Sequence, residues 1–148
     1  MSIGSSRFPL LKHLGSGAFG SVWKSKTPPG SAFYNEHPIV AIKIVPHPDS
    51  NALKEAETLQ KLDHKGCIKL LTCCLDRGNL CLIQEFCDLG DLSSERGSRP
   101  EHEVWRIIRH LSSAFQYIHG HNIIHRDVKP DRRLIEIVKF CFVTKNIL

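Results

Sequence analysis

Residues 15–23 read GSGAFGSVW, and the residues after the glycines in this stretch decide the class of fold. The first six residues match G-x-G-x-x-G, a pattern that also opens the helix of dinucleotide-binding units, where a pyrophosphate binds at the helix N-terminus. Here the glycines lead into Ser21, Val22 and Trp23, which alternate as in a strand. The stretch therefore predicts a glycine-rich β-hairpin. Its backbone amides could approach phosphate oxygens, although an ordinary hairpin that binds nothing fits the same residues.

A charged residue interrupts the next predicted strand. Residues 39–45 read IVAIKIV, an apolar run rich in β-branched residues that is typical of a buried strand and contains Lys43. A lysine among apolar side chains is costly unless it is paired, so a phosphate and a carboxylate would both stabilise it. A predicted helix at 51–62 offers Glu55 or Glu57. A lysine that reaches water from an edge strand is the alternative, and the glycine-rich stretch upstream favours the paired arrangement.

The other segments expected from the residue pattern are a loop at 27–38, a helix over about 51–62, strands at 67–75 and 80–86 around a turn at 76–79, and a long amphipathic helix over about 101–119. Asp49 or Ser50 can cap the first helix. Trp105 and Phe115 on the long helix are expected to be core residues rather than a binding surface.

Residues 125–130 read HRDVKP, and this third motif makes a resemblance specific. GSGAFGSV, VAIK and HRDVKP occur here in the order and at the spacing found in protein kinases, so the chain resembles that family over roughly residues 7–131. The resemblance implies an α+β, two-lobed fold with a complete small lobe, made of an antiparallel sheet and one helix, and a truncated helical large lobe. The expected parts are an extension at 1–7, a kinase domain at 8–131 (small lobe 8–84, hinge 85–91, partial large lobe 92–131) and a divergent tail at 132–148.

The resemblance also implies an ATP site. Gly15, Gly17 and Gly20 would fold over the phosphates with Phe19 at the loop tip, and Val22 and Ala41 would pack on the adenine. Lys43 would contact the α- and β-phosphates, with Glu55 rather than Glu57 as its partner. Gln84 would be the gatekeeper, and the backbone of Glu85 and Cys87 would bind adenine. The residues expected at ATP are Leu14, Gly15, Ser16, Gly17, Ala18, Phe19, Gly20, Ser21, Val22, Ala41, Lys43, Glu55, Glu85 and Cys87.

Two residues of the third motif carry the catalytic roles that the resemblance implies. Asp127 matches the aspartate that accepts or orients the proton of a substrate hydroxyl, and Lys129 matches the lysine that neutralises the transferring phosphoryl group in serine/threonine kinases. The implied reaction is therefore transfer of the γ-phosphoryl group from ATP to serine or threonine in a protein substrate.

The chain departs from the family after Asp131. Arg132 stands where the family has a Mg²⁺-binding asparagine, and D-F-G is absent, so Mg²⁺ is expected for the family but its ligands are missing here. Either residues 132–148 are a degenerate kinase end, with 145–147 at the D-F-G position, or 132–145 are foreign sequence inserted after Asp131. The abrupt end of the match favours the second account. The chain is expected to be inactive. The alternative function is a non-catalytic, pseudokinase-like module for nucleotide binding or interaction, or the chain is a fragment from a mispredicted gene.

Composition limits the remaining possibilities. The 148 residues are 41% hydrophobic and 24% charged, with a net charge of +5 from scattered lysines and arginines. This is typical of one globular domain, and the charge alone is compatible with nucleic acid, an acidic membrane or a polyphosphate. With the resemblance, the expected partners are ATP and a protein substrate, and neither nucleic acid nor a membrane. The six cysteines include no C-x-x-C pair and are expected to be reduced, and His119, His121 and His125 are not expected to bind a metal. Without a signal or membrane-spanning segment, the expected location is the cytoplasm or nucleus.

The long helix raises a stability problem. Its apolar face normally packs against later helices of the large lobe, and leaving that face in water would forgo on the order of 10 kcal/mol of burial. The chain on its own is therefore expected to aggregate or to depend on a partner.

Overall fold

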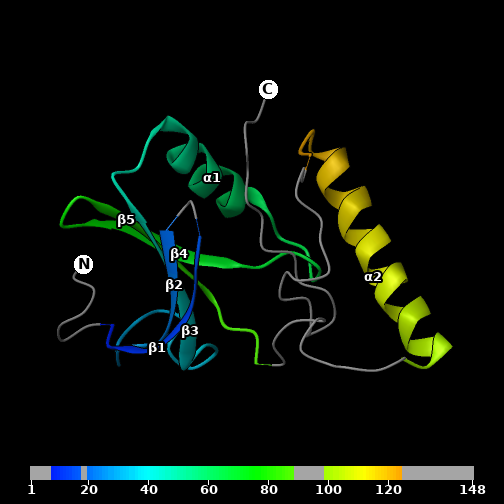
Figure 1. The fold of residues 1–148 in the computed structure, drawn as a ribbon, viewed down its shortest axis with the longest axis horizontal. Coiled ribbons are helices and arrows are strands. Elements are labelled where there is room, and N and C mark those ends of the chain that lie inside the picture. The colour runs from blue at the N-terminus through cyan, green and yellow to red at the C-terminus, as the bar shows by residue number, and fades with distance from the viewer. Residues whose placement is uncertain (1–7, 18–19, 89–98, 125–148) are drawn as a thin grey trace. The chain divides into compact units, whose positions relative to one another are not determined.

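The computed structural model describes residues 8–17, 20–88 and 99–124, which are coloured in Figure 1. These residues divide into two compact units. The first unit comprises the described residues up to Gln60 together with Leu70–Phe86. The second comprises Lys61–Lys69 and the described residues from Cys87 onward. The first unit therefore holds the sheet and the second holds the long helix.

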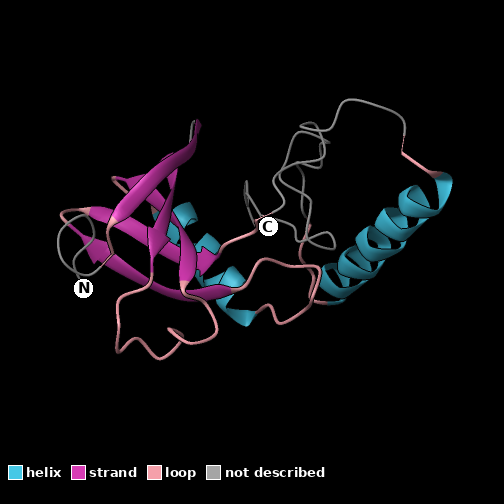
Figure 2. Ribbon diagram, turned by 90° about the horizontal axis from the view of Figure 1, so that it is seen from below, coloured by secondary structure: helices cyan, strands magenta, loops and turns pink. Residues whose placement is uncertain are grey.

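A five-stranded antiparallel sheet forms the first unit, with the strand order β1-β2-β3-β5-β4. The strands are β1 (Leu10–Gly17), β2 (Gly20–Lys26), β3 (Ile39–Pro46), β4 (Leu70–Asp76) and β5 (Asn79–Glu85). Figure 2 shows these strands together in magenta. The α+β class and the antiparallel sheet with one helix are confirmed. The strand expected at 67–75 begins only at Leu70, although Cys67 and Ile68 before it are buried.

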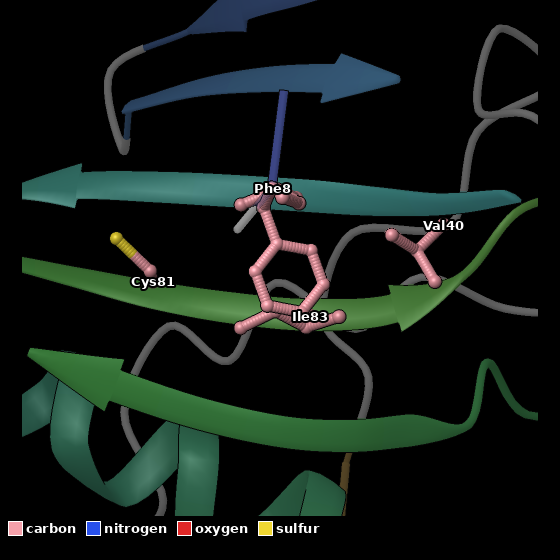
Figure 3. Close-up of a cluster of buried hydrophobic side chains, with 5 residues drawn as sticks. Phe8, Val40, Cys81 and Ile83 are labelled. Carbon is pink, nitrogen blue, oxygen red and sulfur yellow. The ribbon is translucent and has the colours of Figure 1, made fainter. Parts of the chain in front are cut away.

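The two faces of the sheet differ because side chains along a strand alternate. Val40 and Ile42 of β3 lie on one face with Cys81 and Ile83 of β5, and Phe8 covers them. Figure 3 shows Phe8, Val40, Cys81 and Ile83 gathered in this cluster. All five side chains are at most 1% exposed, so this face is an apolar core. Phe8 precedes β1, which explains why the strand pattern alone did not point to it.

Helix α1 (Ser50–Lys61) begins where the sequence predicted. The Asp49 Oδ1 atom accepts a hydrogen bond from the Ala52 backbone N–H at 2.9 Å, so Asp49 rather than Ser50 supplies the cap. The buried residues of α1 lie on one side of the helix and include Ala56, Leu59 and the charged Glu55. A carboxylate on the buried face of a helix requires a partner, and that partner comes from β3.

Helix α2 (Glu101–Gly120) matches the predicted long helix and is drawn as one uninterrupted helix in Figure 2. The Tyr117 hydroxyl accepts a hydrogen bond from the Asp63 backbone N–H at 2.9 Å, and the His64 ring stacks on the Tyr117 ring with a centroid distance of 4.9 Å. These contacts join α2 to the segment Lys61–Lys69 within the second unit. No helix among the described residues is both long and apolar enough to cross a membrane.

The prediction that Trp105 is a core residue is wrong. Its side chain is 56% exposed, and its Nε1 atom donates to Glu101 Oε1 at 3.0 Å along the helix surface. Phe115 is half-buried. Helical periodicity identifies a face but not what covers it, and only Ala114 and Ile118 of α2 are fully buried.

Candidate functional site

Lys43 and Glu55 form a buried ion pair. Lys43 lies in the middle of β3, and its Nζ atom donates to Glu55 Oε1 of α1 at 2.6 Å. Each residue is 5% exposed, whereas Glu57 is exposed. The predicted pairing of the strand lysine with a helix carboxylate is confirmed, and the structure selects Glu55. The pair fixes the lysine in place, and an ammonium carries three hydrogens, so one carboxylate oxygen does not exhaust its capacity to donate.

The strand register gathers the expected adenine-contacting residues on the face that carries Lys43. Val22 of β2 lies directly opposite Lys43, and Leu82 of β5 lies opposite it on the other side. Directly opposite residues in an antiparallel pair point to the same face. Ala41, two residues before Lys43, shares this face because side chains alternate with a period of two. The result is a charged group beside small and branched apolar side chains, on the face opposite the apolar core.

The glycine-rich stretch forms the end of the β1–β2 hairpin, as predicted. Gly15 pairs with Val22, Ser16 with Ser21, and Gly17 with Gly20. The His13 Nε2 atom lies 2.8 Å from Ser16 Oγ, and Trp23 Nε1 donates to Ser21 Oγ at 3.0 Å. Leu14 is half-buried. Ala18 and Phe19, expected at the loop tip, lie outside the described residues.

Gly20 is a glycine of this hairpin whose position excludes any side chain. Its φ angle is +115°, and a Cβ atom built there would lie 2.0 Å from the backbone oxygen of Ile44 in β3. An L-residue would meet both backbone strain and a clash with a main-chain atom. By contrast, nothing lies within 4 Å of a Cβ atom built on Gly17. Gly20 therefore sets how closely the hairpin lies on β3, while Gly17 leaves open space at its end.

A buried amide donor lies beside this site. Gln84 is directly opposite Ala41 in the register and is 3% exposed, so it shares the face of Lys43. Its Nε2 atom has no hydrogen-bond partner within the described part of the chain. Buried polar atoms are usually satisfied, and an exception in a native structure often marks a place where a ligand or water binds. The sequence indicated a gatekeeper role for Gln84 but not this unsatisfied donor.

The end of β5 supplies two further expected residues. Glu85 is the last residue of β5, lies opposite Val40 and is 8% exposed. Cys87, in the second unit, is half-buried. Between them, the Phe86 ring lies 4.2 Å from Lys24 Nζ, a cation–π contact that sequence reasoning missed. No motif signals such a contact, because it joins residues more than sixty positions apart.

The expected catalytic residues fall in a part of the chain that the structure does not describe. Asp127 and Lys129 lie outside the described residues, as does Arg132. Within residues 8–17, 20–88 and 99–124, no group of three or more His, Cys, Asp or Glu side chains could hold a metal ion. The described site therefore offers a fixed ammonium, an apolar wall and a free amide donor. These groups suit an anionic ligand with a flat apolar part, and they do not form a magnesium site.

Sequence comparison gives the family. The profile of a family described as "Protein kinase domain" matches residues 8–141. The chain belongs to the protein kinase family. Its kinase relatives include the mouse "Serine/threonine-protein kinase ULK3", 34% identical over 137 residues, which cover 86% of this chain and 28% of the relative. "Serine/threonine-protein kinase TIO" of Arabidopsis thaliana is 31% identical over 150 residues, which cover 94% of this chain and 11% of that protein.

A fungal kinase shows the same pattern of coverage. "Carbon catabolite-derepressing protein kinase" of Candida albicans is 32% identical over 134 residues, which cover 88% of this chain and 22% of that protein. The chain thus spans less than a third of the length of each of these kinase relatives. Family membership rests on the profile match, which covers most of the chain.

Proposed function

We propose that this chain carries the ATP-binding part of a protein serine/threonine kinase, and that its sheet face with Val22, Ala41 and Lys43 is the nucleotide site. The observation that carries the proposal is the buried 2.6 Å pair between Lys43 and Glu55. Desolvating a lysine among apolar side chains costs free energy, and a hydrophobic residue at the same position is often equally stabilising. Packing alone therefore does not account for a lysine in this strand. A lysine held rigid beside an apolar wall can instead bind a polyphosphate whose base packs on that wall.

The arrangement also supports a role for the hairpin and the hinge. Gly15, Gly17 and Gly20 would cover the phosphates, since their backbone N–H groups can approach without obstruction by side chains. The adenine would lie against Val22 and Ala41, and the unsatisfied Gln84 amide faces the same side of the sheet. The backbone of Glu85 and Cys87 would complete the adenine contacts. The other residues of the proposed site are Leu14, Ser16, Ala18, Phe19 and Ser21.

The proposed reaction of the family is transfer of the γ-phosphoryl group to serine or threonine in proteins. The similarity to two serine/threonine-protein kinases supports this class. Asp127 would orient the substrate hydroxyl, and Lys129 would balance charge on the transferring group. Bound ATP would supply that phosphoryl group, while Lys43 would position it. A cytoplasmic or nuclear location belongs to the same proposal, since ATP and protein substrates are available there.

We also propose that the 148-residue chain by itself binds nucleotide without transferring phosphate. In the kinase pattern that the sequence resembles, Arg132 falls where the family has a metal-binding asparagine, and a fixed cation cannot coordinate Mg²⁺. The second candidate function, a non-catalytic nucleotide-binding module, rests on this replacement of a metal ligand by a cation.

Nucleotide binding can be tested by titrating the full chain with a fluorescent ATP analogue and displacing it with ATP, with and without Mg²⁺. We expect Lys43→Met to weaken binding by about tenfold or more, which corresponds to about 1.4 kcal/mol. Lys54→Met is the matched control, because Lys54 is exposed on α1 beside Glu55. Absence of displaceable binding in the parent chain, or equal binding by the parent and Lys43→Met, would contradict the nucleotide site.

Phosphate transfer requires a separate assay with γ-labelled ATP and a mixture of serine- and threonine-containing peptides. Binding without transfer supports the non-catalytic function of this chain. Transfer that depends on Lys43 would overturn the proposal that the chain is inactive and leave the nucleotide site in place.

A further inference from the structure

Two cysteine side chains face each other across the β4–β5 hairpin. Cys74 of β4 lies directly opposite Cys81 of β5, and both lie on the face of the apolar core. Cys81 is 1% exposed and Cys74 is half-buried. Cys74 packs against the apolar cluster that contains Cys81, and the pKa of each thiol is affected by the other. The two cysteines therefore form a cross-strand pair.

Turn geometry fixes this pairing. The hairpin closes at Asp76 opposite Asn79, with Arg77 and Gly78 as the two turn residues. Both turn residues have positive φ angles, 49° and 78°, which is the requirement of the tight turn whose twist matches two antiparallel strands. With the turn set, the third pair of residues from it is Cys74 and Cys81. A one-residue slip would move Cys81 out of the core, so the packing maintains the same register.

The spacing of such a pair allows a covalent bond. Residues directly opposite in an antiparallel ladder have Cα atoms about 4.5–5.5 Å apart, inside the range of about 4.4–6.8 Å found for disulfides. Their Cβ atoms are about 4.5–5.5 Å apart, slightly more than the usual distance of about 3.5–4.5 Å in a disulfide. The strands must therefore approach a little, and a bond formed under such strain is readily reduced.

We propose that Cys74 and Cys81 are a reversible redox site that forms a disulfide across β4 and β5 when the protein meets a small-molecule disulfide such as oxidised glutathione. The Cys74 thiolate attacks one sulfur of the oxidant, which releases one glutathione and leaves a mixed disulfide on Cys74. The Cys81 thiolate then attacks the Cys74 sulfur, the mixed bond breaks, and the second glutathione leaves. The two protein thiols are oxidised, the oxidant is reduced to two thiols, and the two protons pass to the departing glutathiones.

The order of these steps reflects access. Cys74 is the more exposed of the two, so an oxidant reaches it first, while Cys81 acts from inside the core. Burial raises the pKa of Cys81 to about 12 and also raises the pKa of Cys74. Few thiolates exist at neutral pH, so formation of the bond is slow there and accelerates as the pH rises. Cys73 next to them is exposed and lies opposite the apolar Leu82, so it has no thiol across the ladder.

The test is peptide mapping of the native 148-residue chain. The chain is incubated with oxidised glutathione, quenched with acid, alkylated and digested with trypsin. Cleavage after Lys69, Arg77 and Arg96 gives one peptide with Cys73 and Cys74 and another with Cys81 and Cys87. We expect these peptides to be linked in the parent and in the Cys73→Ser/Cys87→Ser variant, which keeps only the proposed pair in them. We expect Cys74→Ser and Cys81→Ser each to lose the Cys74–Cys81 link.

Two outcomes would overturn the proposal. One is absence of the linked peptide in both the parent and the Cys73→Ser/Cys87→Ser variant. In the parent, fragmentation of the linked peptides identifies which cysteines are joined, and this measurement does not depend on the folding of a variant. The other is a link that forms as readily in urea as in buffer, because the folded hairpin would then not be needed to bring the two cysteines together. A link that forms only in the native chain and disappears with added dithiothreitol supports a reversible site.

Discussion

Lys43 shows how the fold can hold a charged residue inside an apolar strand. The Lys43 ammonium is desolvated on β3, and the carboxylate of Glu55 compensates for the lost water. The pair adds little net stability compared with a well-packed apolar pair, but either partner left alone is a buried, uncompensated charge. The energetic penalty therefore appears when one partner is removed, and it should shrink when both are removed.

A double-mutant cycle tests this coupling. We expect Lys43→Met and Glu55→Gln each to lower the free energy of unfolding, by up to about 3–5 kcal/mol. The double variant should lose less than the sum of the two single losses, by about 0.5–3 kcal/mol. Urea denaturation followed by fluorescence measures all four proteins. Strict additivity would show that the two side chains do not interact in solution.

Gly20 gives a second prediction at this scale, independent of charge. We expect Gly20→Ala to destabilise the chain by about 1–3 kcal/mol from backbone strain alone, and by more because of the contact with the Ile44 oxygen. Gly17→Ala is the matched control from the same hairpin, since open space surrounds its Cβ position and no positive φ is present. Thermal unfolding compares the two variants. Equal losses would contradict the assignment of Gly20 as the close-contact glycine.

At the scale of elements, the hydrophobic periodicity of the sequence predicted where helices and hairpins lie, but it did not predict what surrounds their side chains. The apolar spacing placed α1 and α2 within about a residue of their observed ends, and the turn formers placed the β4–β5 hairpin. The spacing did not show that Trp105 is exposed, because a helical stripe does not reveal what lies against it. The contacts of His64 with Ser113 and Tyr117 were also out of reach, since they join residues about fifty positions apart with no shared motif.

The candidate site likewise combines features that the sequence predicted with features that it did not. The Lys43–Glu55 pair was predictable, because a buried charge demands a partner and the next helix offers only a few carboxylates. The strict need for glycine at Gly20 and the unsatisfied amide of Gln84 depend on atoms of neighbouring strands. Such features arise from tertiary packing, which residue spacing does not encode.

The cap of α1 provides the element-scale prediction. The Ala52 backbone N–H is the main cause that lowers the pKa of Asp49 below its ordinary value of 3.8, because that N–H stabilises the carboxylate. The cap therefore contributes stability above pH 3.8 that is lost as the pH falls through the lower, folded-state pKa. We expect Asp49→Ala to lower the melting temperature at neutral pH, and the gap to the parent to narrow in acid.

Asp49→Asn is the control for that experiment, since asparagine caps a helix without titrating in this range. Its difference from Asp49→Ala should stay nearly constant between about pH 6 and pH 3. A parent–Ala gap that remained constant over the same pH range would contradict the role of the Asp49 carboxylate.

For the molecule as a whole, exposed apolar surface is the feature with consequences in solution. Val104, Trp105 and Ile108 of α2 are 39%, 56% and 42% exposed, and they recur at helical spacing. Exposed apolar side chains grouped in this way favour association. This surface gives a structural basis for the sequence-based expectation that the chain associates.

We expect the parent chain to show light scattering that rises with protein concentration, and Val104→Gln/Ile108→Gln to reduce it. The melting temperature should change little, because these side chains are already exposed in the folded chain. Leu59→Gln is a contrasting variant, as its side chain is 1% exposed and its loss should destabilise the fold. A monodisperse parent with cooperative unfolding would contradict the expected association.

The two-sided character of β3 also bears on which changes in length the chain tolerates. Deleting one residue within Ile39–Pro46 would exchange the faces, turning Lys43 toward the apolar core and Ile42 toward the charged side. The loop between β2 and β3 is different, since the Thr27 N–H donates to the Pro38 oxygen at 2.9 Å and joins its two ends. Residues added between them would lengthen the loop at little entropic cost. Natural length variation in this chain should therefore collect at 28–37 and avoid the strand after it.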